Sequence, residues 1–130
     1  MTEINHKDIE RLKALIYSSP KNVLILSHTN PDGDAIGSSL AWGAFLESKG
    51  HNVTRMVQNR PPSFLDWMKG MDKMVSFKDS RQEDSVDTIS KADIIFCMDF
   101  NQVSRLEALG EAVLQNKAAE FILIDHHLNP

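Results

Sequence analysis

Three short polar segments of the sequence carry side chains that could hold metal ions. The first contains His28, Asp32 and Asp34, the second begins at Asp99, and the third is the Asp-His-His run at 125–127. Carboxylate oxygens combined with imidazole nitrogens suit Mn, Zn or Fe better than Ca or a thiophilic metal. These residue types therefore predict a site for such an ion.

Each segment also has an ordinary structural explanation. The string Asn-Pro-Asp-Gly-Asp at 30–34 is typical of a turn, and Asp34 would cap a helix that begins at Ala35. Asp99 could simply end a strand, and His126 with His127 could be a hydrogen-bonded surface pair. We favour the metal site because all three segments directly follow strongly apolar runs, which places them in equivalent positions.

Those apolar runs predict strands, because they are short, rich in β-branched and apolar residues, and bounded by polar residues. The strongest candidates are 23–26, 92–98 and 121–124, and the weaker ones are 53–57 and 74–77.

Helical patterns alternate with the strands. They cover 8–17, 35–49, 63–69, 83–91 and 103–117. Gly50 is expected to end the second helix as a left-handed C-cap, Pro61-Pro62 precedes the third, and Gly110 is a candidate break in the last.

This alternation predicts an α/β domain with a doubly wound, mostly parallel five-stranded sheet and helices on both faces. Ligands of such sheets bind at the carboxyl ends of the strands, near the point where the strand order reverses. We therefore expect 23–26, 94–98 and 121–124 to lie side by side at the centre of the sheet, so that the three polar segments meet at one edge.

Composition narrows the classes of function. The chain has 130 residues and a net charge of -4 with both signs mixed, which argues against a broad basic surface for long nucleic acids. A short phosphorylated substrate stays compatible, because bound cations supply positive charge locally. No apolar run approaches the ~20 residues of a membrane span. The single cysteine, Cys97, is expected to be a buried apolar residue, and a cytoplasmic location is expected.

The string H-x-x-P-D-G-D-A-x-G-S at 28–38 resembles the first motif of the DHH phosphoesterases. Asp99 stands in the place of the second motif, and Asp125-His126-His127 is similar to the motif that names the family. The resemblance extends from about residue 23 to 129, with the motifs in the expected order.

The resemblance implies two divalent metal ions, with manganese as the expected metal. One ion would be held by His28, Asp32 and Asp99. The second would be held by Asp34, Asp99 and His126, so that Asp99 bridges the pair. Two cations about 3.5–4 Å apart can activate a water molecule and neutralise charge on the attacked phosphoryl group.

The resemblance also implies roles for other residues. His127 would contact the scissile phosphate or protonate the leaving group. Arg105 matches an arginine of the oligoribonuclease-like branch, with a solvated helix residue as the alternative. The expected substrate-binding residues are Asn30, Gly37 and Ser38, the last two in a first helical turn whose N–H groups favour a phosphate.

The implied activity is that of the RecJ-like branch of bacterial oligoribonucleases and nucleoside bisphosphate phosphatases. The substrate would be short RNA or a nucleoside 3′,5′-bisphosphate. Two alternatives within the family are a manganese pyrophosphatase and a cyclic-dinucleotide phosphodiesterase. A third, of a different class, is a non-catalytic metal-binding module.

Residues 1–130 are interpreted as an incomplete N-terminal DHH domain, because relatives continue with a fourth motif and a glycine-rich C-terminal domain. The chain alone is therefore expected to bind at most one ion tightly and to hydrolyse short RNA negligibly. It is also expected to form a homodimer or to self-associate through an exposed strand at 121–124.

Overall fold

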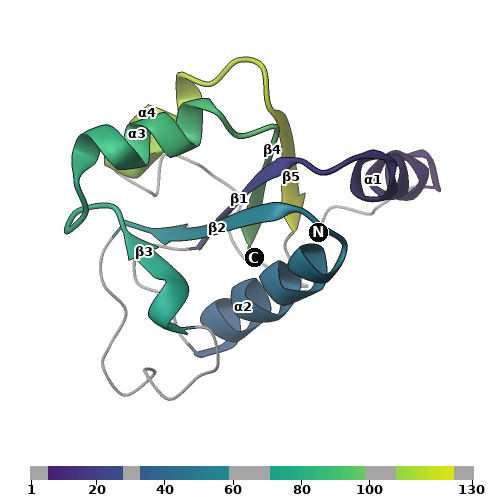
Figure 1. The fold of residues 1–130 in the computed structure, drawn as a ribbon, viewed down its shortest axis with the longest axis horizontal. Helices are drawn as coiled ribbons and strands as arrows, with labels where there is room; N and C mark the ends of the chain where they lie inside the picture. The colour runs from purple at the N-terminus through teal and green to yellow at the C-terminus, as the bar shows by residue number, and fades with distance from the viewer. Residues whose placement is uncertain (1–5, 28–32, 59–70, 99–107, 125–130) are drawn as a thin grey trace, which may run out of the picture.

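The computed structural model describes residues 6–27, 33–58, 71–98 and 108–124, in which helices and strands alternate (Figure 1). In chain order the elements are α1 (His6–Ser18), β1 (Asn22–Leu26), α2 (Gly33–Ser48), β2 (Asn52–Val57), the 3-10 turn η2 (Met71–Lys73), β3 (Met74–Ser76), α3 (Gln82–Ser90), β4 (Ile94–Met98), α4 (Ala108–Leu114) and β5 (Glu120–Ile124). The five predicted strands and four of the five predicted helices are confirmed. The helix expected at 63–69 lies outside the described residues.

The strands form one five-stranded sheet in the order β3-β2-β1-β4-β5. Each neighbouring pair is parallel. The predicted doubly wound parallel sheet is therefore confirmed, and β1, β4 and β5 are consecutive neighbours as expected.

One part of the prediction is wrong: β5 is an edge strand rather than a central one. The centre is β1, which pairs with β2 on one side and β4 on the other. Residues Val23–Leu26 of β1 are at most 2% exposed, whereas Phe121 of β5 is 40% exposed. Sequence apolarity alone made 121–124 resemble a central strand, because an apolar run does not reveal how many neighbours the strand has.

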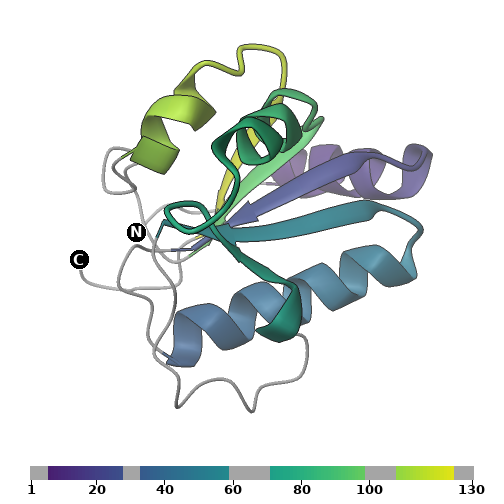
Figure 2. The same cartoon turned by 60° about the vertical axis from the view of Figure 1, so that its left-hand side comes forward.

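Helices cover both faces of the sheet, as predicted. Figure 2 shows α3 and α4 on one side and α2 on the other. The side chains of β1 alternate between the two layers: Val23 and Ile25 pack with α1 and α2, and Leu24 and Leu26 pack with α3 and α4. In the described ranges, no helix combines the length and apolar character that a membrane span requires.

Helix α2 begins at Gly33, two residues before the expected start at Ala35. Asp34 therefore lies in its first turn, and the interpretation of Asp34 as the N-cap is wrong. The C-terminal prediction is confirmed: Gly50 has φ 92, and the N–H groups of Gly50 and His51 donate to Glu47 and Leu46. This is the Schellman arrangement, which a glycine at that position permits.

Helix α4 continues through Gly110, so the candidate break there is wrong. The helix ends at Leu114, before the expected end at Lys117. Asn116 stops it, because its side-chain oxygen accepts the N–H groups of Ala118 and Ala119 at 3.0 Å. A side chain that satisfies the backbone in this way offers an alternative to another helical turn.

Candidate metal centre

The predicted ligand segments all leave the sheet at the same edge. In the parallel register, Leu26 of β1 lies opposite Cys97 of β4. Met98, the last residue of β4, lies opposite Ile124, the last residue of β5. The segments that follow these strands in the sequence begin at Ser27, Asp99 and Asp125. They therefore start from three adjacent positions, as the sequence predicted.

Most of the predicted site residues lie outside the described part of the chain. These are His28, Asn30, Asp32, Asp99, Arg105, His126 and His127. Asp34 lies in the first turn of α2, whereas Gly37 and Ser38 lie in its second turn, so their expected place in the first turn is wrong. A Cβ at Gly37 would meet no described atom within 4 Å, so the backbone of this turn borders open space. The roles of all ten residues stay predictions.

The strand order reverses between β1 and β4. From β1 the chain proceeds through α2 to β2 and then β3, and it returns through α3 to β4 on the other side of β1. Helices that leave in opposite directions open a crevice at the carboxyl ends of such a strand pair. The segments at 28–32 and 99–107 follow these two strands. The strand order thus favours a ligand site at the carboxyl ends of β1 and β4, where the motifs predicted the metal site.

A buried hydroxyl pair fixes the residue that precedes His28. Ser27 is fully buried, its Oγ lies 2.5 Å from Ser39 Oγ on α2, and its N–H donates to Met56 O at 3.2 Å. The residue that directly follows β1 is therefore held both by β2 and by α2. Sequence reasoning missed this pair, although a serine directly after a buried strand was its one signal.

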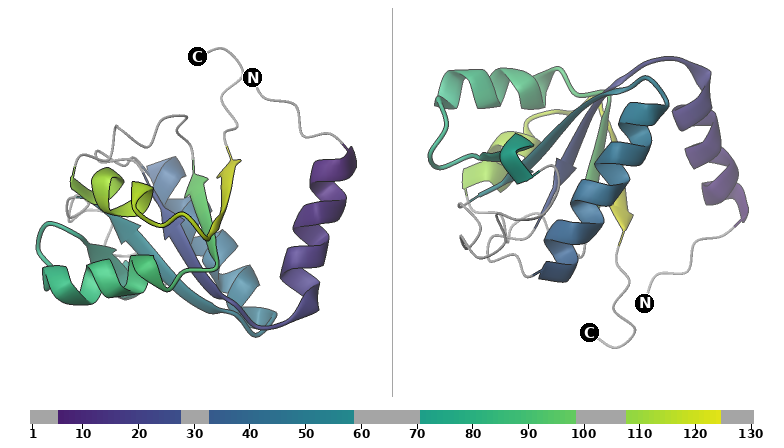
Figure 3. Two further views of the ribbon diagram at one scale, coloured as in Figure 1. Left: turned by 90° about the horizontal axis from the view of Figure 1, so that it is seen from above. Right: turned by 60° about the horizontal axis from the view of Figure 1, so that its bottom comes forward.

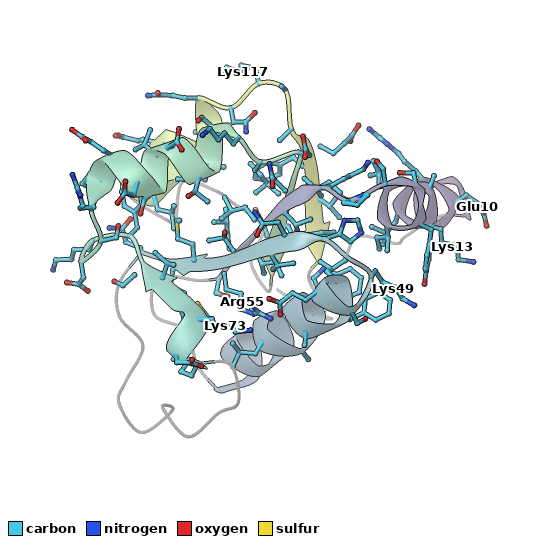
Figure 4. All side chains as sticks on the ribbon, viewed as in Figure 1. Glu10, Lys13, Lys49, Arg55, Lys73 and Lys117 are labelled. Carbon is cyan, nitrogen blue, oxygen red and sulfur yellow. The ribbon has the colours of Figure 1, made fainter. Side chains whose placement is uncertain are left out.

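An ion pair under α2 was also missed. Arg55 of β2 is 3% exposed, and its Nη2 donates to Glu47 Oε1 at 2.8 Å. This contact, with the charges of Arg55 and Lys73, lowers the pKa of Glu47 against the opposing effect of burial. Figure 4 shows Arg55 and Lys73 beside α2. The arginine beside the apolar residues Met56 and Val57 in the same strand was the available signal.

Cys97 is confirmed as a buried apolar residue, with none of its surface exposed. Burial raises the pKa of its thiol to about 12, because a thiolate would lose its hydration in the core. The thiol is therefore neutral and belongs to the packing between β4 and the α3–α4 layer.

The predicted donor set would suit a divalent ion such as Mn, Zn or Fe. Among the side chains that the structure describes, no three His, Cys, Asp or Glu residues are grouped to hold a metal. The predicted donors belong to the segments that follow β1, β4 and β5 in the sequence and to the first turn of α2. They combine imidazole nitrogens with carboxylate oxygens. This chemistry suits such ions, and the carboxylates balance their charge.

The chain matches known proteins along most of its length. The family described as "DHH family, N-terminal domain" matches residues 22–130. A solved structure of an exopolyphosphatase-related protein from Bacteroides fragilis is similar, with a TM-score of 0.85 and 35% sequence identity. That similarity covers 100% of this chain and 38% of the other chain. The chain therefore belongs to the DHH family, a family of metal-dependent phosphoesterases, and matches its N-terminal domain.

Proposed function

We propose that this protein hydrolyses short oligoribonucleotides or a nucleoside 3′,5′-bisphosphate with two divalent metal ions, manganese first among them. The observation that carries the proposal is the shared edge of β1, β4 and β5. These three parallel neighbours are each followed directly by a segment with predicted ligands. Membership of the DHH family supports the same chemistry.

The residues present fit the proposed metal pair. His28, Asp32 and Asp99 would hold one ion, and Asp34, Asp99 and His126 would hold the other. When bound, the ions supply activation of a water molecule and charge neutralisation at the phosphoryl group.

The remaining predicted residues would bind and orient the substrate. The first backbone N–H groups of α2, which begins at Gly33, favour a phosphate through the helix dipole and their free hydrogens. Gly37 and Ser38 would contact the substrate from the next turn. Asn30 would contact the substrate, and Arg105 would pair with phosphate charge. His127 would protonate the leaving oxygen.

A second candidate is hydrolysis of a phosphoanhydride, as by a manganese pyrophosphatase. The observation in its favour is the name of the similar Bacteroides fragilis protein, which is exopolyphosphatase-related. Phosphoester and phosphoanhydride hydrolysis would use the same metals, so the substrate is decided by groups around the site. A cyclic-dinucleotide phosphodiesterase and a non-catalytic metal-binding module are further outcomes of the tests below.

Manganese should raise the thermal stability of the protein, because it binds the folded ligand cluster and hardly binds the unfolded chain. At ~100 times the dissociation constant the expected stabilisation is about 2.7 kcal/mol. Asp99→Asn should remove most of this gain, since Asp99 is proposed to serve both ions. A thermal-melt titration with MnCl2 measures both effects.

Asp93→Asn is a matched control at the opposite end of the same strand. Asp93 precedes β4, and its carboxylate accepts the N–H of Asn22 at 2.9 Å, a contact that an asparagine oxygen can keep. This variant should retain the full manganese shift. Equal manganese shifts for the wild type and Asp99→Asn would contradict the bridging assignment.

The substrate is tested with one panel on the protein loaded with manganese. It compares a dinucleotide RNA, a nucleoside 3′,5′-bisphosphate, pyrophosphate, long-chain polyphosphate and a cyclic dinucleotide. The proposal expects the first two to have the highest kcat/KM. Preference for polyphosphate or pyrophosphate would establish the second candidate instead, and manganese binding without turnover of any of them would indicate a non-catalytic module.

A further inference from the structure

A cavity opens at the amino end of the sheet, opposite the edge where the segments with the predicted metal ligands begin. Its volume is about 220 Å³, and it lies between the first residues of β1 and β2 and the last turn of α3. Pockets for drug-sized ligands measure about 300–1,000 Å³. The cavity therefore suits a smaller molecule. Its polar lining residues are Asn22, Asn52, Thr54, Asp87, Thr88 and Lys91.

Thr54 is a polar residue on a face of the sheet that is otherwise part of the core. It lies opposite Leu24 in the parallel register, and Leu24 packs in the α3–α4 layer with none of its surface exposed. Met56, the next residue of β2 on the same face, is 1% exposed. The Thr54 hydroxyl has no hydrogen-bond partner among the residues that the structure describes. It is therefore a polar group on the cavity wall that a ligand can bind.

Two asparagines form an amide pair beside Thr54. Asn22 and Asn52 are register partners at the starts of β1 and β2, and Asn52 Nδ2 donates to Asn22 Oδ1 at 3.1 Å. Asn22 Nδ2 in turn donates to Lys91 O at 3.3 Å. Within the described ranges, the Oδ1 and the second N–H of Asn52 form no hydrogen bond. Asn52 thus offers an acceptor and a donor on one planar group whose orientation Asn22 fixes.

The charges around the cavity favour an uncharged ligand. Lys91 Nζ lies 3.0 Å from Asp87 Oδ2, so these two charges balance each other. Lys91 is also the C-cap of α3, and the C-terminal end of a helix carries partial negative charge that disfavours anions. A phosphate or a carboxylate is therefore a poor occupant. A neutral ring with an amino group suits the acceptors better.

We propose that this cavity binds a nucleobase that carries an amino group beside a ring nitrogen, as adenine does. The Asn52 amide accepts a hydrogen bond from the amino group and donates one to the ring nitrogen, which is the pairing that asparagine makes with adenine in DNA. The Thr54 hydroxyl supplies a third hydrogen bond. The site lies at the opposite end of the sheet from the predicted metal centre and does not depend on the proposed function.

The test titrates adenosine, inosine and uridine into the isotope-labelled protein without metal and follows the amide signals by NMR. Inosine has a ring carbonyl in place of the amino group of adenosine, so an acceptor would face Asn52 Oδ1. The three nucleosides carry no phosphate. Because metal ions are also omitted, the predicted metal centre offers these probes no charge to bind.

Three variants separate the cavity from the rest of the surface. Thr54→Val removes the unpaired hydroxyl at nearly constant shape, and Asn52→Leu removes the amide. Ser90→Ala is the matched control on α3, because the Ser90 hydroxyl donates to Asp87 O at 2.8 Å and Ser90 lines a different cavity, between α3 and α4. Melting temperatures show whether each variant is folded.

We expect adenosine to shift the amide signals of Asn52, Thr54 and Thr88 saturably. Inosine and uridine should bind about tenfold more weakly or worse, because two facing acceptors lose a hydrogen bond and leave both groups unpaired. Asn52→Leu should weaken adenosine binding by about tenfold and Thr54→Val by about fivefold. Thr54→Val breaks no described hydrogen bond, so it decides the question if Asn52→Leu does not fold. Ser90→Ala should bind adenosine as the wild type does.

Several results would overturn the proposal. One is the absence of saturable shifts at the cavity with adenosine at its solubility limit, and another is equal binding of adenosine and inosine. Shifts confined to the carboxyl edge, around Leu26 and Met98, would assign the nucleoside to the other end of the sheet. Unchanged affinity in Thr54→Val and Asn52→Leu would also place the nucleoside elsewhere. None of these results bears on the proposed metal site, which the manganese titration tests separately.

Discussion

Arg55 holds a guanidinium beneath α2, in a position where only 3% of its surface is exposed. Its Nη2 donates to Glu47, while its Nε has no hydrogen-bond partner among the residues that the structure describes. A buried cation is costly unless a counter-charge lies beside it. Glu47 of α2 supplies that charge, with its side chain 34% exposed. The pair is therefore partly screened by solvent, and its contribution lies between those of surface and buried ion pairs.

Glu47→Gln should lower the free energy of unfolding at pH 7 by roughly 1–3 kcal/mol, between typical surface and buried values. Arg55 lowers the pKa of Glu47 in the folded state. The stability from the carboxylate is thus fully present above the pKa of an unfolded glutamate and is lost as pH falls through the lowered pKa. Urea titrations from pH 7 down to the acid limit should show the wild type and Glu47→Gln converging.

Glu10→Gln is the control, because Glu10 and Lys13 are 59% and 62% exposed and lie 4.0 Å apart. The unfolding free energy of Glu10→Gln should stay within about 0.5 kcal/mol of the wild-type value over the whole pH range of the urea titrations. A pH-independent difference between the wild type and Glu47→Gln would contradict the assigned ion pair.

Two glycines of α2 have opposite surroundings. A Cβ on Gly43 would lie 2.5 Å from both Nε and Nη2 of Arg55, whereas a Cβ on Gly37 would meet no described atom within 4 Å. Because Gly43 has no side chain, the guanidinium of Arg55 can pack directly against the backbone of α2. Gly37 makes no such contact. Its low helix propensity, compared with that of alanine, makes α2 less stable.

Gly43→Ala should destabilise the protein by about 1–3 kcal/mol, as overpacking of a core does. Gly37→Ala should instead stabilise it by roughly 0.5–1 kcal/mol through helix propensity. In an Arg55→Met background the Gly43→Ala change should lose most of its cost, because the guanidinium is no longer there. Denaturant unfolding of the four variants measures these differences, and additivity of Gly43→Ala and Arg55→Met would contradict the assigned contact.

His51, just after the C-terminus of α2, connects this helix to α1 and β1. Its Nδ1 accepts the N–H of Lys21 at 3.1 Å, and its Nε2 donates to Ile16 O at 2.7 Å. The residue that follows the Gly50 cap thus binds the end of α1 and the start of β1. In Figure 3, α1 lies at the side of the molecule beside the β5 end of the sheet. The Arg11–Glu120 ion pair attaches it to β5.

The two edges of the sheet differ in length and exposure. On one edge β3 has three residues, and on the other β5 has five. Within the described ranges β5 pairs with β4 alone, and its Phe121 is 40% exposed. An edge strand of this kind presents unpaired N–H and C=O groups to a second chain. Self-association through β5 therefore stays the expected behaviour of the chain.

Phe121→Lys should weaken concentration-dependent self-association of the chain, since a lysine on an edge strand opposes pairing with another edge. Leu114→Lys is the matched control, because Leu114 is a 55% exposed apolar residue on α4 rather than on the edge. Sedimentation velocity over a range of concentrations compares the two. If Leu114→Lys has the larger effect, association occurs through the helical face.

The strands, most of the helices and the ligand types of the site were determined by the sequence itself. These features depend on local patterns: apolar runs for strands, helical periodicity, and a glycine where Gly50 takes φ 92. The strands carrying the motifs were predicted to be neighbours because shared metals require it. This prediction is confirmed for β1, β4 and β5.

Only the tertiary structure decided that β1 is the centre of the sheet. It alone paired Gln58 with Leu109 and Ser27 with Ser39. It alone brought the guanidinium of Arg55 against Gly43. Each of these contacts joins residues of different elements, and a buried polar group takes whichever partner the packed elements bring within reach. A local pattern shows that a residue is polar or apolar, but its partner depends on the strand order and helix placement of the whole domain.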